Sequence, residues 1–251
     1  MKHIEFICVC NKGCIRHENQ DNFLVDKHYL EAQNDGLNYP LEGLVSVEGN
    51  PLFAVFDGMG GASCGEIAAY ISADTLYKSD SEYKIDSEDL LNTAYMQMNR
   101  NVCDYMTKNR ISSMGSTASV LLFKNNEYIV SNLGDSPVFR FANDRLIKIS
   151  SEHTDTESYP GSKPGLTQYV GIPEEEFIIE PYFKTDSLDV GDRFLLCSDG
   201  LTDMVSNLEI GNILGESDIK TSAQKLVDAA LENGGKDNIT VVLCEIRGEE
   251  V

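Results

Sequence analysis

Short apolar runs bounded by turn residues recur along most of the chain, and this pattern predicts β-strands. Pairs such as Asn-Asn, Gly-Asp and Asn-Asp stand between several of the runs, as they do in β-hairpins. The expected strands cover residues 4–10, 21–26, 51–58, 116–124, 127–134, 137–143, 145–150, 176–184, 192–200 and 238–246.

Three other stretches repeat apolar residues every three or four positions, which is the period of an α-helix. The first predicts a helix from Ala62 to about Lys78, and Ser87 is placed to cap the second helix. The second and third helices are indicated by Leu91, Tyr95, Met98, Val102 and Tyr105, and by Ala223, Leu226, Val227 and Ala230.

The elements come in groups of strands and groups of helices, which favours an α+β fold over alternating βαβ units. A sandwich of two mostly antiparallel sheets with helices outside would use every element. Residues from about 150 to 175 have weak periodicity and many Gly, Pro and Ser residues, so we expect a short flap-like loop there. We expect one domain over residues 1–251.

The composition, 41% hydrophobic and 24% charged over 251 residues, suits one globular domain with a sizeable core. No apolar run is long enough to span a bilayer, and the N-terminal run is too short for a signal peptide. We therefore expect a cytoplasmic protein, acting as a monomer. Seven scattered cysteines favour reduced thiols, and Cys8, Cys10 and Cys14 are interpreted as packing residues rather than as a thiolate metal site.

The net charge is −21, from 41 acidic and 20 basic residues. Such a surface repels nucleic acids and anionic membranes, so neither is expected as a partner. It does not repel divalent cations. For most of these acidic residues, solubility is a sufficient explanation.

Aspartates stand at the ends of several expected strands. Asp57 ends the run "LFAVF", Asp199 ends "RFLLCS", and Asp135 follows "YIVSN" in a turn, while Asp21 and Asp237 stand just before strands. Each one alone is ordinary turn chemistry. Together they predict a shared cleft, because acids at the ends of neighbouring central strands point to the same place.

A cluster of carboxylates needs protons or cations, since two of them 4 Å apart repel by about 4 kcal/mol at an effective dielectric constant near 20. Ligands that are all oxygen favour Mg²⁺, Mn²⁺ or Ca²⁺. Gly58 would offer its carbonyl without a Cβ in the way. Water held between two such ions is a nucleophile toward phosphoryl groups. Arg16 is placed to bind phosphate, or alternatively to pair with Glu18 or another surface acid.

Six segments, in order, resemble the bacterial metal-dependent PPM (PP2C-type) protein serine/threonine phosphatases: "RHENQD", "VFDGMGG", "MGSTAS", "SNLGDS", "LLCSDGLTD" and "GGKDNITVV". Each motif is weak alone, but the ordered set is specific and covers about Arg16 to Val242. The resemblance implies a four-layer αββα sandwich. It also implies a centre with two divalent cations, Mn²⁺ or Mg²⁺, that hydrolyses phosphoserine and phosphothreonine in proteins.

By position, the resemblance implies that Asp57 bridges both metals and that Gly58 contributes its carbonyl oxygen. Asp199 and Asp237 would bind the first metal. Asp21 would support the second metal through its waters.

The resemblance also implies that Arg16 holds the substrate phosphate. A third, weaker metal would be bound by Asp135 together with Asp199 or Asp203. Asn238 would orient the last acidic loop.

The chain departs from the family pattern at several positions. Gln20 replaces a frequent Glu, which removes one acidic ligand, and Met59 stands where eukaryotic members carry a His proposed as general acid. Pro137 replaces an Arg, and Arg140 comes too late to be its equivalent. His153 is a candidate general acid, the alternative being an exposed loop histidine.

The function expected from the sequence is a metal-dependent protein phosphatase, whose substrates would be phosphorylated by a cognate serine/threonine kinase. The alternative is a catalytically weak module of the same fold that binds phosphorylated partners or senses a ligand. The aspartates that would bind metal are all present, which favours the enzyme. The sequence does not identify the physiological substrate.

Overall fold

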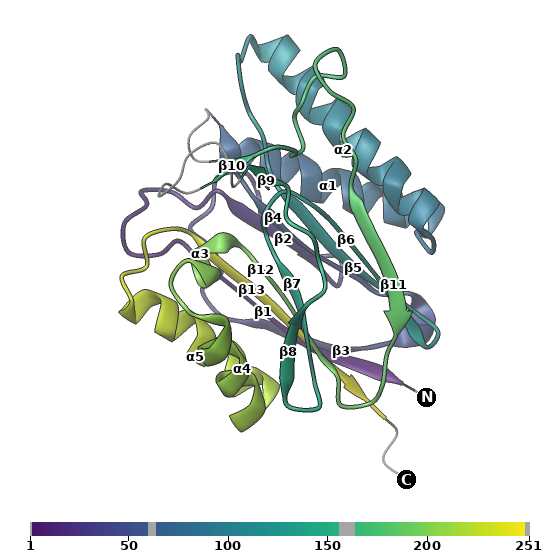
Figure 1. Cartoon of the computed structure of the whole chain (residues 1–251). Helices are drawn as coiled ribbons and strands as arrows, with labels where there is room; N and C mark the ends of the chain where they lie inside the picture. The colour runs from purple at the N-terminus through teal and green to yellow at the C-terminus, as the bar shows by residue number, and fades with distance from the viewer. Residues whose placement is uncertain (1, 60–63, 156–163, 249–251) are drawn as a thin grey trace.

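The computed structural model describes residues 2–59, 64–155 and 164–248, and these form four layers (Figure 1). Two antiparallel β-sheets face each other at the centre. Helices α1 (Gly65–Tyr83) and α2 (Glu88–Asn109) cover one sheet, and α4 (Asn207–Glu216) and α5 (Ile219–Glu232) cover the other. The predicted αββα sandwich is confirmed.

The first sheet contains six strands, and all of its ladders are antiparallel. In spatial order it consists of β3 (Leu41–Ser46), β1 (His3–Asn11), β13 (Ile239–Arg247), β12 (Arg193–Cys197), β7 (Val138–Ala142) and β8 (Arg145–Lys148). The chain ends thus pair at the centre of the sheet, where β1 lies beside β13.

The second sheet contains five strands and is also antiparallel throughout. In spatial order it consists of β11 (Tyr182–Ser187), β6 (Glu127–Leu133), β5 (Ala118–Lys124), β4 (Leu52–Asp57) and β2 (Asp21–Val25). Short elements complete the fold: η1 (Val47–Gly49), α3 (Asp199–Thr202) and the two-stranded pair β9 (Thr154–Asp155) and β10 (Gly165–Leu166).

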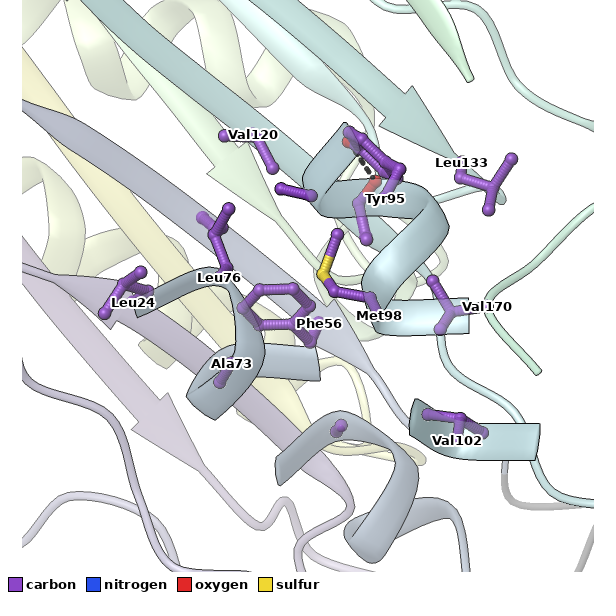
Figure 2. Close-up of a cluster of buried hydrophobic side chains, with 14 of the residues drawn as sticks. Leu24, Phe56, Ala73, Leu76, Tyr95, Met98, Val102, Val120, Leu133 and Val170 are labelled. Atoms are coloured by element: carbon purple, nitrogen blue, oxygen red, sulfur yellow. Dashed lines mark hydrogen bonds between the residues drawn. The ribbon is translucent and has the colours of Figure 1, made fainter. Parts of the chain in front are cut away.

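Three apolar clusters correspond to the three interfaces between the layers. The first joins α1 and α2 to the second sheet, and Figure 2 shows Phe56 of β4 and Met98 of α2 within it. The middle cluster lies between the sheets, where the Phe194 ring packs 5.2 Å from Phe123 and 4.8 Å from Tyr128 between ring centroids. Burial on both faces explains why the central strands have nearly continuous apolar sequences.

Most predicted elements are confirmed, including α2 with Ser87 as its N-cap, which accepts a hydrogen bond from the Leu90 backbone N–H. The predicted start of the first helix, Ala62, lies outside the described residues. The strand predicted over residues 176–184 is wrong in its first half, because β11 begins only at Tyr182. Phe177 and Ile178 are exposed, and Pro181 has no N–H to give to a ladder.

The interpretation of the cysteines as packing residues is confirmed for Cys8 and Cys10, which are buried, whereas Cys14 is exposed. All seven cysteines are free thiols. Across the described helices, none has both the length and the apolar character needed to cross a bilayer.

Candidate active site

The site begins with two aspartates on neighbouring strands of the second sheet. The antiparallel register pairs Asp21, the first residue of β2, with Asp57, the last residue of β4. Asp21 is buried, whereas Asp57 keeps an exposed fraction. Two aspartates at strand ends therefore lie on paired positions of neighbouring strands, as the sequence predicted.

Asp57 is fixed through its backbone. Its N–H donates to Thr117 Oγ1 at 3.0 Å, and the Thr117 N–H donates to the Asp57 carbonyl at 2.9 Å. The Thr117 hydroxyl also hydrogen-bonds the Ser136 hydroxyl at 2.7 Å. This chain of contacts ties the end of β4 to the turn that carries Asp135.

Gly58 lies where a side chain has no room. Its N–H donates to the Gln20 carbonyl at 3.1 Å. A Cβ at this position would clash with the carbonyl oxygens of Gly65 and Gln20. The backbone after Asp57 can therefore pack this closely against Gln20 and Gly65 only because residue 58 is glycine.

The opposite sheet supplies Asp199 and Asp237. Asp199 follows β12 and opens α3, while Asp237 precedes β13, and these two strands are hydrogen-bonded neighbours. Asn238 fixes the second loop, because its Oδ1 accepts from the Gln20 N–H at 2.8 Å and its Nδ2 donates to the Lys12 and Glu18 carbonyls. Its backbone N–H also donates to Asp237 Oδ1 at 2.9 Å, which fits the orienting role expected for Asn238.

Arg16 lies against this loop. Its Nη2 donates to Asp237 Oδ2 at 2.7 Å, so its ion pair is with a site aspartate and not with Glu18. That hydrogen bond is the largest cause of the raised pKa of Arg16, and the charges of Asp57 and Asp199 add to it. Arg16 therefore lies within the field of the acidic cluster.

The carboxylates act on one another strongly. Burial raises the pKa of Asp57 well above its usual range, and the charges of Asp199, Asp21, Asp135 and Asp237 raise it further, in that order. All five expected aspartates therefore meet in one electrostatic neighbourhood. Burial likewise raises the pKa of Asp21 to about 7, with Asp199 and Asp237 adding to the rise.

Over residues 2–59, 64–155 and 164–248, no three His, Cys, Asp or Glu side chains already form a compact metal-ligand cluster. The aspartates are instead close enough for their charges to raise one another's pKa values. Clustered carboxylate oxygens whose charges act on one another, with Arg16 paired to Asp237, are the kind of oxygen ligands that suit hard divalent cations. Asp203 lies one helical turn after Asp199, and its N–H donates to the Asp199 carbonyl at 2.7 Å.

His153 is half-buried beside the turn that precedes Asp135. The ring Nδ1 of His153 accepts from the Gly134 N–H at 3.3 Å, and the backbone N–H of His153 donates to the Gly134 carbonyl at 3.0 Å. Burial lowers the pKa of the ring, partly offset by backbone groups of Gly134 and Glu180. The general-acid role of His153 stays a prediction, and its ring lies against the turn that precedes Asp135.

The departures from the family pattern have structural counterparts. Gln20 is buried and its Nε2 donates to Glu66 Oε2 at 3.2 Å, so a nearby carboxylate is present although position 20 is not acidic. Met59 lies against Gly115 and donates its N–H to the carbonyl of that glycine. Arg140, beyond Pro137, forms a largely buried ion pair of 2.6 Å with Asp192, away from the aspartates of the site.

Sequence reasoning missed the hydroxyl groups around the aspartates. Ser198 and Thr240 both donate to Asp21 Oδ2 at 2.7 Å, and Thr117 holds Asp57. They stand inside the motifs "LLCSDGLTD", "GGKDNITVV" and "MGSTAS". Only Ser198 directly precedes an acid, Asp199, so adjacency could have indicated one of the three hydroxyl groups.

A four-layer sandwich with an oxygen-lined acidic centre is the architecture of the metal-dependent protein phosphatases. The sequence model of the Protein phosphatase 2C family matches residues 41–243, and the chain belongs to this family. The resemblance drawn from the six motifs is confirmed.

Two curated relatives illustrate the similarity. Protein phosphatase PhpP of Streptococcus pneumoniae is 30% identical over 226 residues, which cover 82% of this chain and 90% of PhpP. Serine/threonine protein phosphatase PstP of Mycobacterium tuberculosis is 29% identical over 237 residues, which cover 88% of this chain. The match covers 44% of PstP, so the chain spans less than half of that relative's length.

Solved structures share the fold. PppA of Pseudomonas aeruginosa aligns with a TM-score of 0.77 and 27% identity over 97% of both chains. The catalytic domain of PstP, in complex with two manganese ions, aligns with a TM-score of 0.78 and 24% identity over 99% of this chain and 100% of that one.

Proposed function

We propose that the protein hydrolyses phosphoserine and phosphothreonine esters in proteins with the help of two divalent cations, Mn²⁺ or Mg²⁺. One observation carries the proposal: Asp21 and Asp57 from one sheet meet Asp199 and Asp237 from the other, and Arg16 lies beside them. Membership in the protein phosphatase 2C family and the names of the relatives support the same activity. The PstP catalytic domain with two manganese ions supports the number of cations.

Each residue has a distinct role in this proposal. Asp57, Asp199 and Asp237 would hold the cations directly, with the carbonyl of Gly58, while Asp21 would act through the hydration shell. Such ions, when bound, turn water into a nucleophile near neutral pH and offset charge on the phosphoryl oxygens. The chain's own residues fix where the reaction can occur.

Arg16 would bind the phosphate by bidentate hydrogen bonds, because a guanidinium matches two phosphoryl oxygens. Asp237 holds the guanidinium in place through the 2.7 Å ion pair. Arg16 is therefore a substrate-binding residue in this proposal, and Asp57 and Asp21 complete the catalytic set.

A third, weaker cation site is part of the proposal. Asp135 and Asp199 both raise the pKa of Asp57, so both lie near the centre. Asp203 is the C-cap residue of α3, which Asp199 opens. The ligands would be Asp135 with Asp199 or Asp203.

The partners proposed are phosphorylated proteins, made by a cognate serine/threonine kinase, with the phosphatase acting in the cytoplasm as a monomer. The net charge of −21 supports the absence of nucleic-acid and anionic-membrane partners. The segment over residues 150–175 borders the turn of Asp135 through His153, so it is placed to contact substrate, although residues 156–163 lie outside the described part.

The experiment is a panel of phosphopeptides incubated with the full chain, with and without Mn²⁺, and with phosphotyrosine peptides as controls. Mn²⁺-dependent release of phosphate from phosphoserine and phosphothreonine peptides is the expected result. The second candidate, a binding module of the same fold, predicts peptide binding without turnover. Calorimetry with Mn²⁺ alone separates the two, because the module would lack tight metal sites.

A further inference from the structure

Two hydroxyl groups from the first sheet reach across to Asp21 at the edge of the second. Ser198 Oγ and Thr240 Oγ1 each donate to Asp21 Oδ2 at 2.7 Å. Ser198 and Thr240 are fully buried, and Asp21 is 2% exposed. The contacts join residues separated by 177 and 219 positions in the chain, so they form only when the two sheets pack together.

The surrounding backbone fixes the direction of the Ser198 hydrogen bond. The Thr240 N–H donates to Ser198 Oγ at 3.0 Å, and the Ser198 N–H donates to the Thr240 carbonyl at 3.1 Å. Since Ser198 Oγ already accepts from a backbone amide, its own hydrogen is directed elsewhere. The Asp21 carboxylate at 2.7 Å is a closer acceptor than the Asn238 carbonyl at 3.4 Å.

The Thr240 hydroxyl has one hydrogen and two acceptors within reach. Asp21 Oδ2 lies at 2.7 Å, and Cys10 Sγ lies at 3.3 Å. The carboxyl oxygen is the closer acceptor and a stronger one than sulfur, so the hydrogen goes to Asp21. Cys10 Sγ also accepts a hydrogen bond from Asn19 Nδ2 at 3.2 Å, so the network continues to Asn19.

Both hydroxyls bind the same carboxylate oxygen. Among the described residues, no donor reaches Asp21 Oδ1. The pair therefore occupies one oxygen of Asp21 and leaves the other without a hydroxyl partner, on a carboxyl group whose charge is coupled to those of Asp57, Asp199 and Asp237. Hydrogen-bond partners of a metal-binding side chain orient that side chain without touching the metal. Loss of one such partner typically lowers metal affinity about 10- to 100-fold.

We propose that Ser198 and Thr240 are positioning residues that hold the Asp21 carboxylate in the orientation in which it serves a divalent-cation site. The inference rests on the proposed function, because it assumes that Asp21 belongs to such a site. Neither residue contacts substrate in this assignment. They act only through Asp21.

The test measures Mn²⁺ binding by calorimetry, without substrate, on the full chain. T240V removes the hydroxyl while keeping the side-chain shape, and T240S keeps the hydroxyl. T75V is the matched control, since Thr75 is a buried threonine whose hydroxyl accepts from Asn101 Nδ2 on α2. We expect T240V to weaken Mn²⁺ binding about tenfold or more, and T240S and T75V to bind within about threefold of the wild type.

A double-mutant cycle separates positioning from a structural effect. In a D21N background, T240V should change Mn²⁺ affinity little, because the carboxylate that it serves is already gone. Circular dichroism and urea unfolding in EDTA establish that each variant is folded, and S198A provides a second route if T240V does not fold.

The outcomes are distinct. If the wild type binds Mn²⁺ and T240V binds it equally well, the positioning role is wrong while the proposed function stands. An equal loss from T240V with or without D21N also overturns the role, since the effect would not pass through Asp21. If the wild type binds no Mn²⁺, the cation site fails and this inference fails with it.

Discussion

Arg16 and Asp237 lie 221 positions apart in the chain and form an ion pair of 2.7 Å between Nη2 and Oδ2. The loop before β2 and the loop before β13 therefore meet, and the site closes only when both ends of the chain are in place. An arginine in contact with a carboxylate is also held in one position, which reduces the ordering needed to receive a phosphate.

Replacing Asp57 or Asp199 by Asn should remove Mn²⁺-dependent hydrolysis. Asn keeps the side-chain shape but cannot supply the negative charge that a hard cation needs. We expect the rate with p-nitrophenyl phosphate to fall more than about 100-fold, beyond the loss caused by an outer partner of a metal ligand. Steady-state kinetics over a range of Mn²⁺ concentrations checks this.

D228N is the matched control for these variants, because Asp228 lies on the exposed face of α5, where it accepts from Gln224 Nε2. It should retain the wild-type rate. Near-wild-type turnover by D57N would show that Asp57 is not the central ligand.

Gly58→Ala should weaken both Mn²⁺ binding and hydrolysis. The new Cβ would meet the carbonyl oxygens of Gly65 and Gln20, so the backbone would have to move directly after Asp57. We expect a loss of about tenfold or more in Mn²⁺ affinity, measured by calorimetry.

Gly49→Ala is the control for that substitution, because a Cβ at Gly49 has no atom within 4 Å. This variant should bind Mn²⁺ like the wild type and unfold at an equal or slightly higher urea concentration. A G58A protein with unchanged Mn²⁺ affinity would remove Gly58 from the site.

The layers, and the grouping of the aspartates, could be predicted from the sequence for a physical reason. Strands buried on both faces have continuous apolar runs, and a carboxylate at the end of such a run is conspicuous, as at Asp57 and Asp199. The half-exposed strand β3 carries no such run and was not predicted, and neither was α4. The first half of the strand predicted over residues 176–184 failed, and apolar residues such as Ile178 are exposed there.

The partners of the aspartates could not be predicted from local pattern. Ser198 and Thr240 contact Asp21 only through packing of one sheet on the other, and spacing along the chain says nothing about that packing. The pairing of Arg16 with Asp237 rather than Glu18 likewise depends on tertiary structure. The hydrogen bonds of these aspartates and the coupling of their charges can be determined only from the folded structure.

Phe194→Ala should strongly destabilise the fold. Phe194 is fully buried between the sheets and packs edge-on against Phe123, with ring centroids 5.2 Å apart. We expect the free energy of unfolding to fall by about 3–5 kcal/mol, measured by urea unfolding. Phe177→Ala, at a residue that is 46% exposed, should cost about 0.5 kcal/mol, and equal costs for the two would contradict the two-sheet core.

Asp80→Asn should stabilise the protein at pH 7. Asp80 lies in the last turn of α1, where burial raises the pKa of its carboxyl and a negative charge opposes the helix dipole. Asn can still accept the hydrogen bond that Asp80 Oδ1 receives from the Ile85 N–H at 3.1 Å. We expect a gain of about 0.5 kcal/mol in the free energy of unfolding.

The pH dependence gives this prediction its sign. Because the pKa of Asp80 is raised in the folded state, the folded protein binds more protons than the unfolded chain above pH 4, and wild-type stability falls as pH rises through that range. The advantage of D80N should therefore shrink toward pH 3.

D218N should behave oppositely and lose stability at pH 7, since hydrogen bonds from Thr221 lower the pKa of Asp218. Urea unfolding of both variants at several pH values checks this, and a D80N advantage that grew toward pH 3 would show that the charge at residue 80 does not oppose folding.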